Sequence, residues 1–241
     1  MNAGAASHGE ARQRYLPAVA AVFVTALVVA NIIAAKLFQA GSLILPAAVV
    51  IFPVSYIVGD ILTEVYGYAR ARQVIWIGFA CNLLAVGAIE VSIRLAPVPF
   101  WRLPGFGSAE LSQQAYAAVF GTAPRILVAS FAAYLCGEFL NAFVLAKMKI
   151  ATGGRHLWMR TIGSTLIGQL ADSSVFIALA FSGTVPAAAL AVMIVTQWLV
   201  KSAYEALATP LTYFVVSRLK HAENEDFYDV GTSFNPLAWR R

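Results

Sequence analysis

Six long stretches of the chain consist mainly of apolar residues with few or no charges. They span roughly residues 16–38, 43–65, 72–95, 124–147, 160–182 and 187–217. A helix needs about 20 apolar residues to cross roughly 30 Å of hydrocarbon, and each stretch reaches that length. The pattern therefore predicts an all-α membrane protein with six transmembrane helices. The last stretch would exceed about 45 Å as one helix, so we expect it to tilt, or to bend near Thr209–Pro210.

Composition supports this prediction, since 60% of the 241 residues are hydrophobic and only 12% are charged. Soluble domains carry about twice that share of charge. The first apolar stretch is too long for the core of a cleaved signal peptide, which favours a retained helix. Cys81 and Cys136 lie inside apolar stretches and give no disulfide framework. We expect no cofactor and no metal site.

Lysine and arginine residues collect between particular helices, and this asymmetry predicts the orientation. Cytoplasmic loops of membrane proteins carry the excess of these residues. One side would hold Arg12, Arg14, Arg70, Arg72, Lys147, Lys149, Arg155, Arg160, Arg218, Lys220, Arg240 and Arg241, and the other Lys36, Arg94, Arg102 and Arg125. Both termini are therefore expected inside, and the net charge of +5 needs no nucleic-acid partner to explain it.

The chain divides accordingly into a cytoplasmic tail (1–15), a six-helix transporter domain (16–220) and a second cytoplasmic tail (221–241), expected to be solvated and mobile. The loop over 96–123 would be external, lying at the membrane interface through its aromatic residues or forming a lid.

Ionisable and amide residues inside the predicted helices are the candidates for function. A charge in the bilayer costs several kcal/mol, so such residues normally face a cavity or a partner. The candidates for substrate binding are Asp60, Glu64, Glu138, Asn141, Gln169, Asp172, Trp198, Lys201, Tyr204 and Glu205. We expect the acids and amides among them to converge on a sheltered pocket midway through the membrane.

Each candidate also has a plainer interpretation. Lys201 would form a buried ion pair with Asp172 or Glu205, and Asp60 and Glu64 would form a solvated helix end near Arg70 and Arg72. Gln169 would only bond across helices. Trp198 and Tyr204 would face lipid. Glu90 and Arg94, four residues apart, are interpreted as a structural ion pair.

Three of these segments resemble a known family. They are Ser55–Gly67, Gly168–Ser173, and Lys201–Glu205 with Thr209–Pro210. Together they are similar to the bacterial queuosine precursor transporters of the vitamin uptake transporter family, and the resemblance covers residues 16–220. It implies a multi-pass inner-membrane importer of 7-deazaguanine bases, such as 7-cyano-7-deazaguanine, used in tRNA modification. It also implies a fold like the substrate-binding subunits of vitamin importers, without a dedicated ATPase.

The residues fit a base of this kind. A guanine-like edge presents an N–H beside an exocyclic NH2, and a carboxylate can accept both. We expect Asp172 or Glu138 to bind that edge with help from Gln169, and aromatic rings to stack on the heterocycle. Lys201 and Glu205 would set the charge balance. Asp60 and Glu64 would form a gate or proton relay near the inner exit.

Other functions stay open at this point. A substrate-capture subunit would need a separate energising partner. An intramembrane enzyme would need an acid pair, for which Asp60 with Asp172 is the candidate. The chain has no glycine loop for ATP and no H-E-x-x-H or G-x-S-x-G motif, so we expect no enzyme. The expected partners are a small-molecule substrate and the lipid bilayer, with a homodimer as an option.

Overall fold

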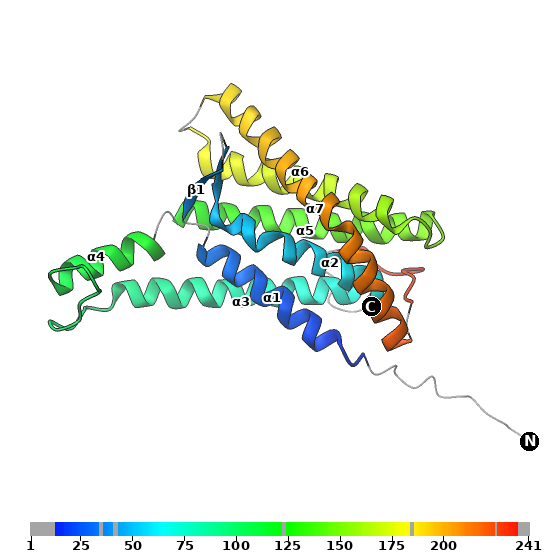
Figure 1. The fold of residues 1–241 in the computed structure, drawn as a ribbon, viewed down its shortest axis with the longest axis horizontal. Coiled ribbons are helices and arrows are strands. Elements are labelled where there is room, and N and C mark those ends of the chain that lie inside the picture. Colours follow the sequence, from blue (N-terminus) through cyan, green and yellow to red (C-terminus); the bar gives the residue numbers. More distant parts are fainter. Residues whose placement is uncertain are drawn as a thin grey trace, which may run out of the picture.

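The computed structural model describes residues 13–33, 36–40, 43–121, 124–183, 186–224 and 226–235. Within them the chain forms seven α-helices, a two-stranded hairpin and one 3-10 turn (Figure 1). In chain order these are α1 (Leu16–Ile33), β1 (Leu37–Ala40), β2 (Leu43–Pro46), η1 (Ala47–Val50), α2 (Phe52–Tyr66), α3 (Tyr68–Arg94), α4 (Ala109–Phe120), α5 (Pro124–Ala151), α6 (Leu157–Phe181) and α7 (Ala187–Glu223).

All the helices except α4 pack into one bundle with α2 inside it. α2 is short, yet it contacts α1, α3, α5 and α7. α6 packs against α5 and α7, and α7 crosses the bundle obliquely (Figure 1). α7 continues as one helix through Pro210, so the predicted bend does not interrupt the helix, while its tilt in the membrane stays a prediction. Four helices among the described residues are long and apolar enough to span a membrane: α1, α3, α5 (from Val128) and α6.

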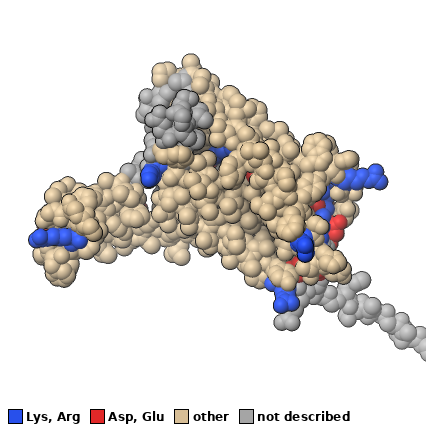
Figure 2. Space-filling model, viewed as in Figure 1, with Lys and Arg blue, Asp and Glu red and all other residues tan. Residues whose placement is uncertain are grey.

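The helical body begins and ends at the same end of the bundle. The backbone N–H groups of Arg14 and Tyr15 donate to the Glu223 carboxylate at 3.0 and 2.7 Å, which joins the start of α1 to the end of α7. We call this the basic end, because it gathers Arg14, Arg70, Arg72, Lys147, Lys149, Arg155, Arg160, Arg218 and Lys220. Figure 2 shows charged side chains at the two ends of this face and a largely uncharged band between them.

Gly67 makes the tight turn that joins α2 to α3 at the basic end. Its φ of +83° lies in the left-handed region that favours glycine. A Cβ atom there would also lie 2.2 Å from the ring of Phe227. A side chain at this position would therefore be strained and would collide with the C-terminal segment.

The prediction of a helix over 43–65 is wrong in its first part. Residues Leu43–Pro46 form β2, which pairs antiparallel with β1 from Leu37↔Pro46 to Ala40↔Leu43. A short apolar run does not distinguish a strand from a helix, and Pro46 cannot donate a helical hydrogen bond. Pro53 lies in the first turn of α2, where a proline is tolerated.

The predicted loop over 96–123 contains a helix, α4, that packs on the end of α3 beyond the bundle (Figure 1). Gln113 Nε2 donates to the backbone oxygen of Ile93 at 2.6 Å, and the hydroxyls of Ser92 and Tyr116 lie 2.9 Å apart. Nearby, Glu90 and Arg94 form the predicted ion pair at 3.4 Å.

Most of the described residues 226–235 of the C-terminal tail are exposed, but the tail also makes specific contacts with the bundle. Asp229 is buried and accepts from the backbone N–H of Tyr68 at 3.1 Å with each carboxylate oxygen. The ring of Phe234 packs on Tyr68, and Arg72 donates at 2.8 Å to the backbone oxygen of Ser233. Two carboxylates, backbone carbonyls and the ring of Phe234 therefore hold the tail on the bundle. Burial raises the pKa of Asp229 more than the Tyr68 N–H lowers it.

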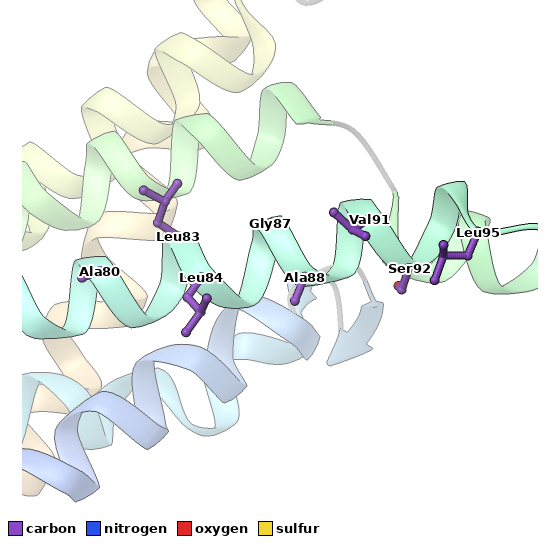
Figure 3. Close-up of a pocket in the computed structure, with 8 residues that line it drawn as sticks. All are labelled: Ala80, Leu83, Leu84, Gly87, Ala88, Val91, Ser92 and Leu95. Atoms are coloured by element: carbon purple, nitrogen blue, oxygen red, sulfur yellow. The ribbon is translucent and has the colours of Figure 1, made fainter.

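A shallow apolar groove of about 690 Å³ runs along the second half of α3 (Figure 3). Its lining comes from one helix and its end: Ala80, Leu83, Leu84, Gly87, Ala88, Val91, Ser92 and Leu95. Leu84 is 74% exposed, as expected for a side chain that faces lipid acyl chains.

Candidate functional site

Acids and amides from four helices meet in the interior of the bundle. We call the following residues the central cluster: Asp60 of α2, Glu138 and Asn141 of α5, Gln169 and Asp172 of α6, and Lys201 and Glu205 of α7. All except Lys201 are buried, with Asp60, Glu138 and Asn141 at 0% exposure. The predicted convergence of these side chains is thus present in the fold, while a hollow between them stays a prediction.

Glycines bring the helices of the central cluster into close contact. A Cβ atom on Gly137 of α5 would lie 2.7 Å from Asp172 Cβ, and one on Gly168 of α6 would lie 2.8 Å from Asn141 Cβ. A Cβ on Gly59 of α2 would lie 2.0 Å from Glu138 Oε1. Small residues at these positions therefore allow α2, α5 and α6 to approach each other at the level of the acids.

Two specific contacts order the cluster. Lys201 donates to Asp172 Oδ2, which is one of the two ion pairs that the sequence left open. Asn141 Nδ2 donates to Asp60 Oδ1 at 2.7 Å. Asp60 and Asp172, the acid pair needed for intramembrane hydrolysis, thus bind different partners.

The other acids of the cluster approach each other, and no ion pair with a cation is present for them in the described part of the chain. Glu138 lies close enough to Glu205 and Asp172 for their charges to interact, and Asp60 does so with Glu205 and Glu138. Tyr134 of α5 is buried beside Glu138 and Asp172. Tyr134 is not among the residues predicted from the sequence, although it stands four residues before Glu138 and so shares its helix face.

Several buried polar atoms of the central cluster and of its neighbours Tyr134 and Ser173 have no hydrogen-bond partner among the described residues. They are Glu138 Oε1 and Oε2, Asp60 Oδ2, Asn141 Oδ1, Gln169 Oε1, Glu205 Oε1 and the hydroxyl oxygens of Tyr134 and Ser173. A buried polar atom left unpaired costs about 1–3 kcal/mol. Such a group is expected where a ligand, a proton or an ordered water binds to the unpaired atom.

The structure places three predicted site residues outside the central cluster. Tyr204 is 46% exposed on α7, as in the lipid-facing interpretation. Trp198 is half-buried and donates from Nε1 to the backbone oxygen of Leu166 at 2.9 Å, which links α7 to α6. Glu64 lies one turn along α2 from Asp60, at the basic end, with partners of its own.

Glu64 is the centre of a buried ion cluster that we call the basic-end ion cluster. Its members are Glu64, Lys149, Arg160, Lys220 and Asp226. Arg160 donates to both Glu64 oxygens, with Nη2 to Oε1 at 3.1 Å, and Lys220 donates to Oε1 at 2.6 Å. The solvated helix end beside Arg70 and Arg72 is therefore wrong for Glu64, which is 1% exposed.

Asp226 of the tail completes this ion cluster from outside the bundle, with its carboxylate 2.9 Å from both Lys149 and Lys220. Partial burial raises the pKa of Asp226, but the hydrogen bonds from Lys220 and Lys149 outweigh this and hold the pKa below its ordinary value. The basic end is therefore held by charges from α2, α5, α6, α7 and the tail together.

Comparison with known proteins identifies the family to which this chain is similar. The family model described as "Putative vitamin uptake transporter" matches residues 46–215, a range that contains every residue of the central cluster. The chain belongs to this family. Together with the candidate spans, membership makes the chain a multi-pass membrane protein of a transporter family. The predicted membership of the vitamin uptake transporter family is therefore confirmed.

Curated relatives within the vitamin uptake transporter family carry more specific names. A Bacillus subtilis protein named "Probable queuosine precursor transporter" is 29% identical over 189 residues, which are 78% of this chain and 79% of that protein. The Escherichia coli protein named "Queuosine precursor transporter" is 29% identical over 130 residues, 54% of this chain and 52% of that protein. No solved structure matches this chain significantly.

Proposed function

We propose that this chain imports a queuosine precursor, a 7-deazaguanine base such as 7-cyano-7-deazaguanine, across the bacterial inner membrane for use in tRNA modification. Membership of the vitamin uptake transporter family and the names of the relatives support this substrate class. In this proposal the body spans the membrane six times and the basic end faces the cytoplasm, because basic residues are retained on that side.

The observation that carries the proposal is the set of unpaired acceptor oxygens in the central cluster. Both oxygens of Glu138 lack a partner within the described part of the chain, as do Gln169 Oε1 and Asn141 Oδ1. A guanine-like edge carries the complementary donors, an N–H beside an NH2 group, and a carboxylate can accept both. A base bound there would satisfy atoms that the fold itself leaves unpaired.

The contacts favour Glu138 over Asp172 as the group that binds this edge. Asp172 already accepts from Lys201, whereas neither oxygen of Glu138 has a donor among the described residues. Asp172 would then hold Lys201 in place, and the side chains of Gln169 and Asn141 would contact the remaining polar atoms of the base. Tyr134 lies beside Glu138 and offers a ring and a hydroxyl to the same ligand.

Uptake in cells tests the proposal. A strain unable to make the base receives this gene, and labelled 7-cyano-7-deazaguanine is followed into the cells. We expect uptake only with the gene, and a loss of about 5- to 150-fold in apparent affinity for Glu138→Gln, corresponding to about 1–3 kcal/mol for one bidentate pair.

Glu90→Gln is the matched control, because it makes the same chemical change on an exposed ion pair of α3. It should take up the base like the wild type, with both variants present in the membrane at equal amounts. The proposal would be refuted if uptake with the gene were no higher than uptake by the strain without it, or if Glu138→Gln took up the base like the wild type.

A further inference from the structure

The central cluster holds more negative groups than positive ones. The ionisable groups that face one another there are Asp60 and Tyr56 from α2, Glu138 and Tyr134 from α5, Asp172 from α6, and Glu205 and Lys201 from α7. Lys201 neutralises Asp172 through their ion pair. Asp60, Glu138 and Glu205 are left without a cationic partner among the described residues.

Three adjacent carboxylates in this position would be very unfavourable. An uncompensated buried ion costs several kcal/mol, and neighbouring like charges add to that cost. Asn141 donates one hydrogen bond to Asp60, which offsets part of the cost for that carboxylate alone. Protons bound to the carboxyl groups remove the remaining charge at the lowest cost in free energy.

The unpaired oxygens point independently to a ligand at these acids. Asp60 Oδ2, Glu205 Oε1 and both Glu138 oxygens are fully buried and have no hydrogen-bond partner in the ranges that the structure describes, while the side chains lie close to one another. A proton on one carboxyl group would turn an acceptor into a donor and allow it to bond to the next. A base bound at Glu138 would then exchange such a bond for its own N–H donors.

We propose that Asp60, Glu138 and Glu205 form a proton-binding site that couples import of the base to inward movement of at least one proton. The inference rests on the proposed function. A proton from external water binds a carboxylate and forms an O–H bond before the base enters. When the cytoplasmic side opens, that O–H bond breaks, the proton passes to internal water, and the carboxylate is ready for the next cycle.

Proteoliposomes containing the purified chain provide the test. Exchange of labelled 7-cyano-7-deazaguanine without any gradient measures the proposed function alone. With the membrane potential clamped at zero, an outside pH one unit lower should drive about tenfold accumulation for one proton per base, since one pH unit is worth about 1.36 kcal/mol. A pH-sensitive dye inside should report acidification when the base is added outside.

Substitution separates proton coupling from folding. Glu205→Gln should lower the number of protons moved per base, a ratio that a purely structural role would leave unchanged. Glu90→Gln should retain both the ratio and the rate. Infrared spectroscopy at neutral pH should show the carbonyl stretch of a protonated carboxyl group in the wild type, weakened in Glu205→Gln, without any base present.

The outcomes distinguish the two proposals. Exchange of the base without proton movement, or accumulation that depends on sodium instead of the pH gradient, would overturn proton coupling and leave the import function standing. A missing protonated-carboxyl band would also overturn it. Absence of exchange would overturn the import function and the coupling together.

Discussion

Replacing Glu64 by glutamine would remove the anion that joins α2, α5, α6 and α7 at the basic end. Glutamine has the same shape but no charge. Among the described residues, Lys149 and Lys220 would then retain Asp226 as an anionic partner. No described ion pair joins Arg160 to another carboxylate. Arg160 would retain the backbone oxygens of Arg155 and Gly154, both at 3.1 Å.

The expected loss follows from the burial of the pair. Glu64 and Arg160 have side chains only 1% exposed. Removing one partner of a buried ion pair costs about 3–5 kcal/mol, and the remaining contacts of the cations favour the lower value, about 3 kcal/mol. For a chain of this size each kcal/mol shifts the melting temperature by about 2–4 °C, so we expect a decrease of about 6–12 °C.

The assay is fluorescence-detected size-exclusion chromatography of detergent-solubilised protein after stepwise heating. Glu90→Gln is the control, because its partner Arg94 is 77% exposed and such pairs contribute about 0.3–0.5 kcal/mol, or at most about 2 °C. If Glu64→Gln melts within that small interval of the wild type, the basic-end ion cluster does not stabilise the bundle as we infer.

Three further predictions test packing, pairing and pH dependence. Gly137→Ala would place a methyl group 2.7 Å from Asp172 Cβ and should lower the free energy of unfolding by about 1–3 kcal/mol. Gly87 has open space around it, so Gly87→Ala should be neutral or stabilising in the same melting assay. Equal effects of the two variants would contradict the close helix contact at Gly137. Lys201→Met should destabilise the chain by about 3–5 kcal/mol, because it leaves Asp172 as an unpaired buried charge. Adding Asp172→Asn should recover most of that loss, and a double variant as unstable as Lys201→Met alone would argue against the ion pair. Asp226→Asn should melt slightly below the wild type at neutral pH, by less than about 1 kcal/mol because the carboxylate is half-exposed. Because the folded-state pKa of Asp226 lies below its ordinary 3.8, this difference should be complete above that pH and vanish as the pH falls through the folded value; a difference that grows on acidification would show that the tail is held otherwise.

Much of the fold and of the central cluster was predictable from the sequence, because charges are expensive in a bilayer and must find each other. That rule selected Asp60, Glu138, Asp172 and Glu205 on four separate helices, and the structure brings them together. It also predicted an ion pair of Lys201 with Asp172 or Glu205, and the structure has the pair with Asp172.

Contacts between distant parts of the chain were not predictable in the same way. Glu64 binds Arg160 and Lys220, which the sequence analysis used only as markers of orientation. The faces of α7 were indistinct because polar and apolar residues occur all round it, so Tyr204 was assigned to the site although it is 46% exposed. The β1–β2 hairpin was missed because its apolar run is equally compatible with a helix.

Equilibrium binding of labelled 7-cyano-7-deazaguanine to the purified chain tests most directly whether the central cluster recognises a guanine-like edge. Unlabelled 7-deazaguanine should compete, while 7-deazaadenine, which lacks the paired N–H and NH2 donors of that edge, should compete about 5- to 150-fold more weakly. Glu138→Gln should reduce this discrimination, and Glu90→Gln should retain it. Equal competition by the two bases, or no saturable binding, would contradict recognition by the buried acceptors.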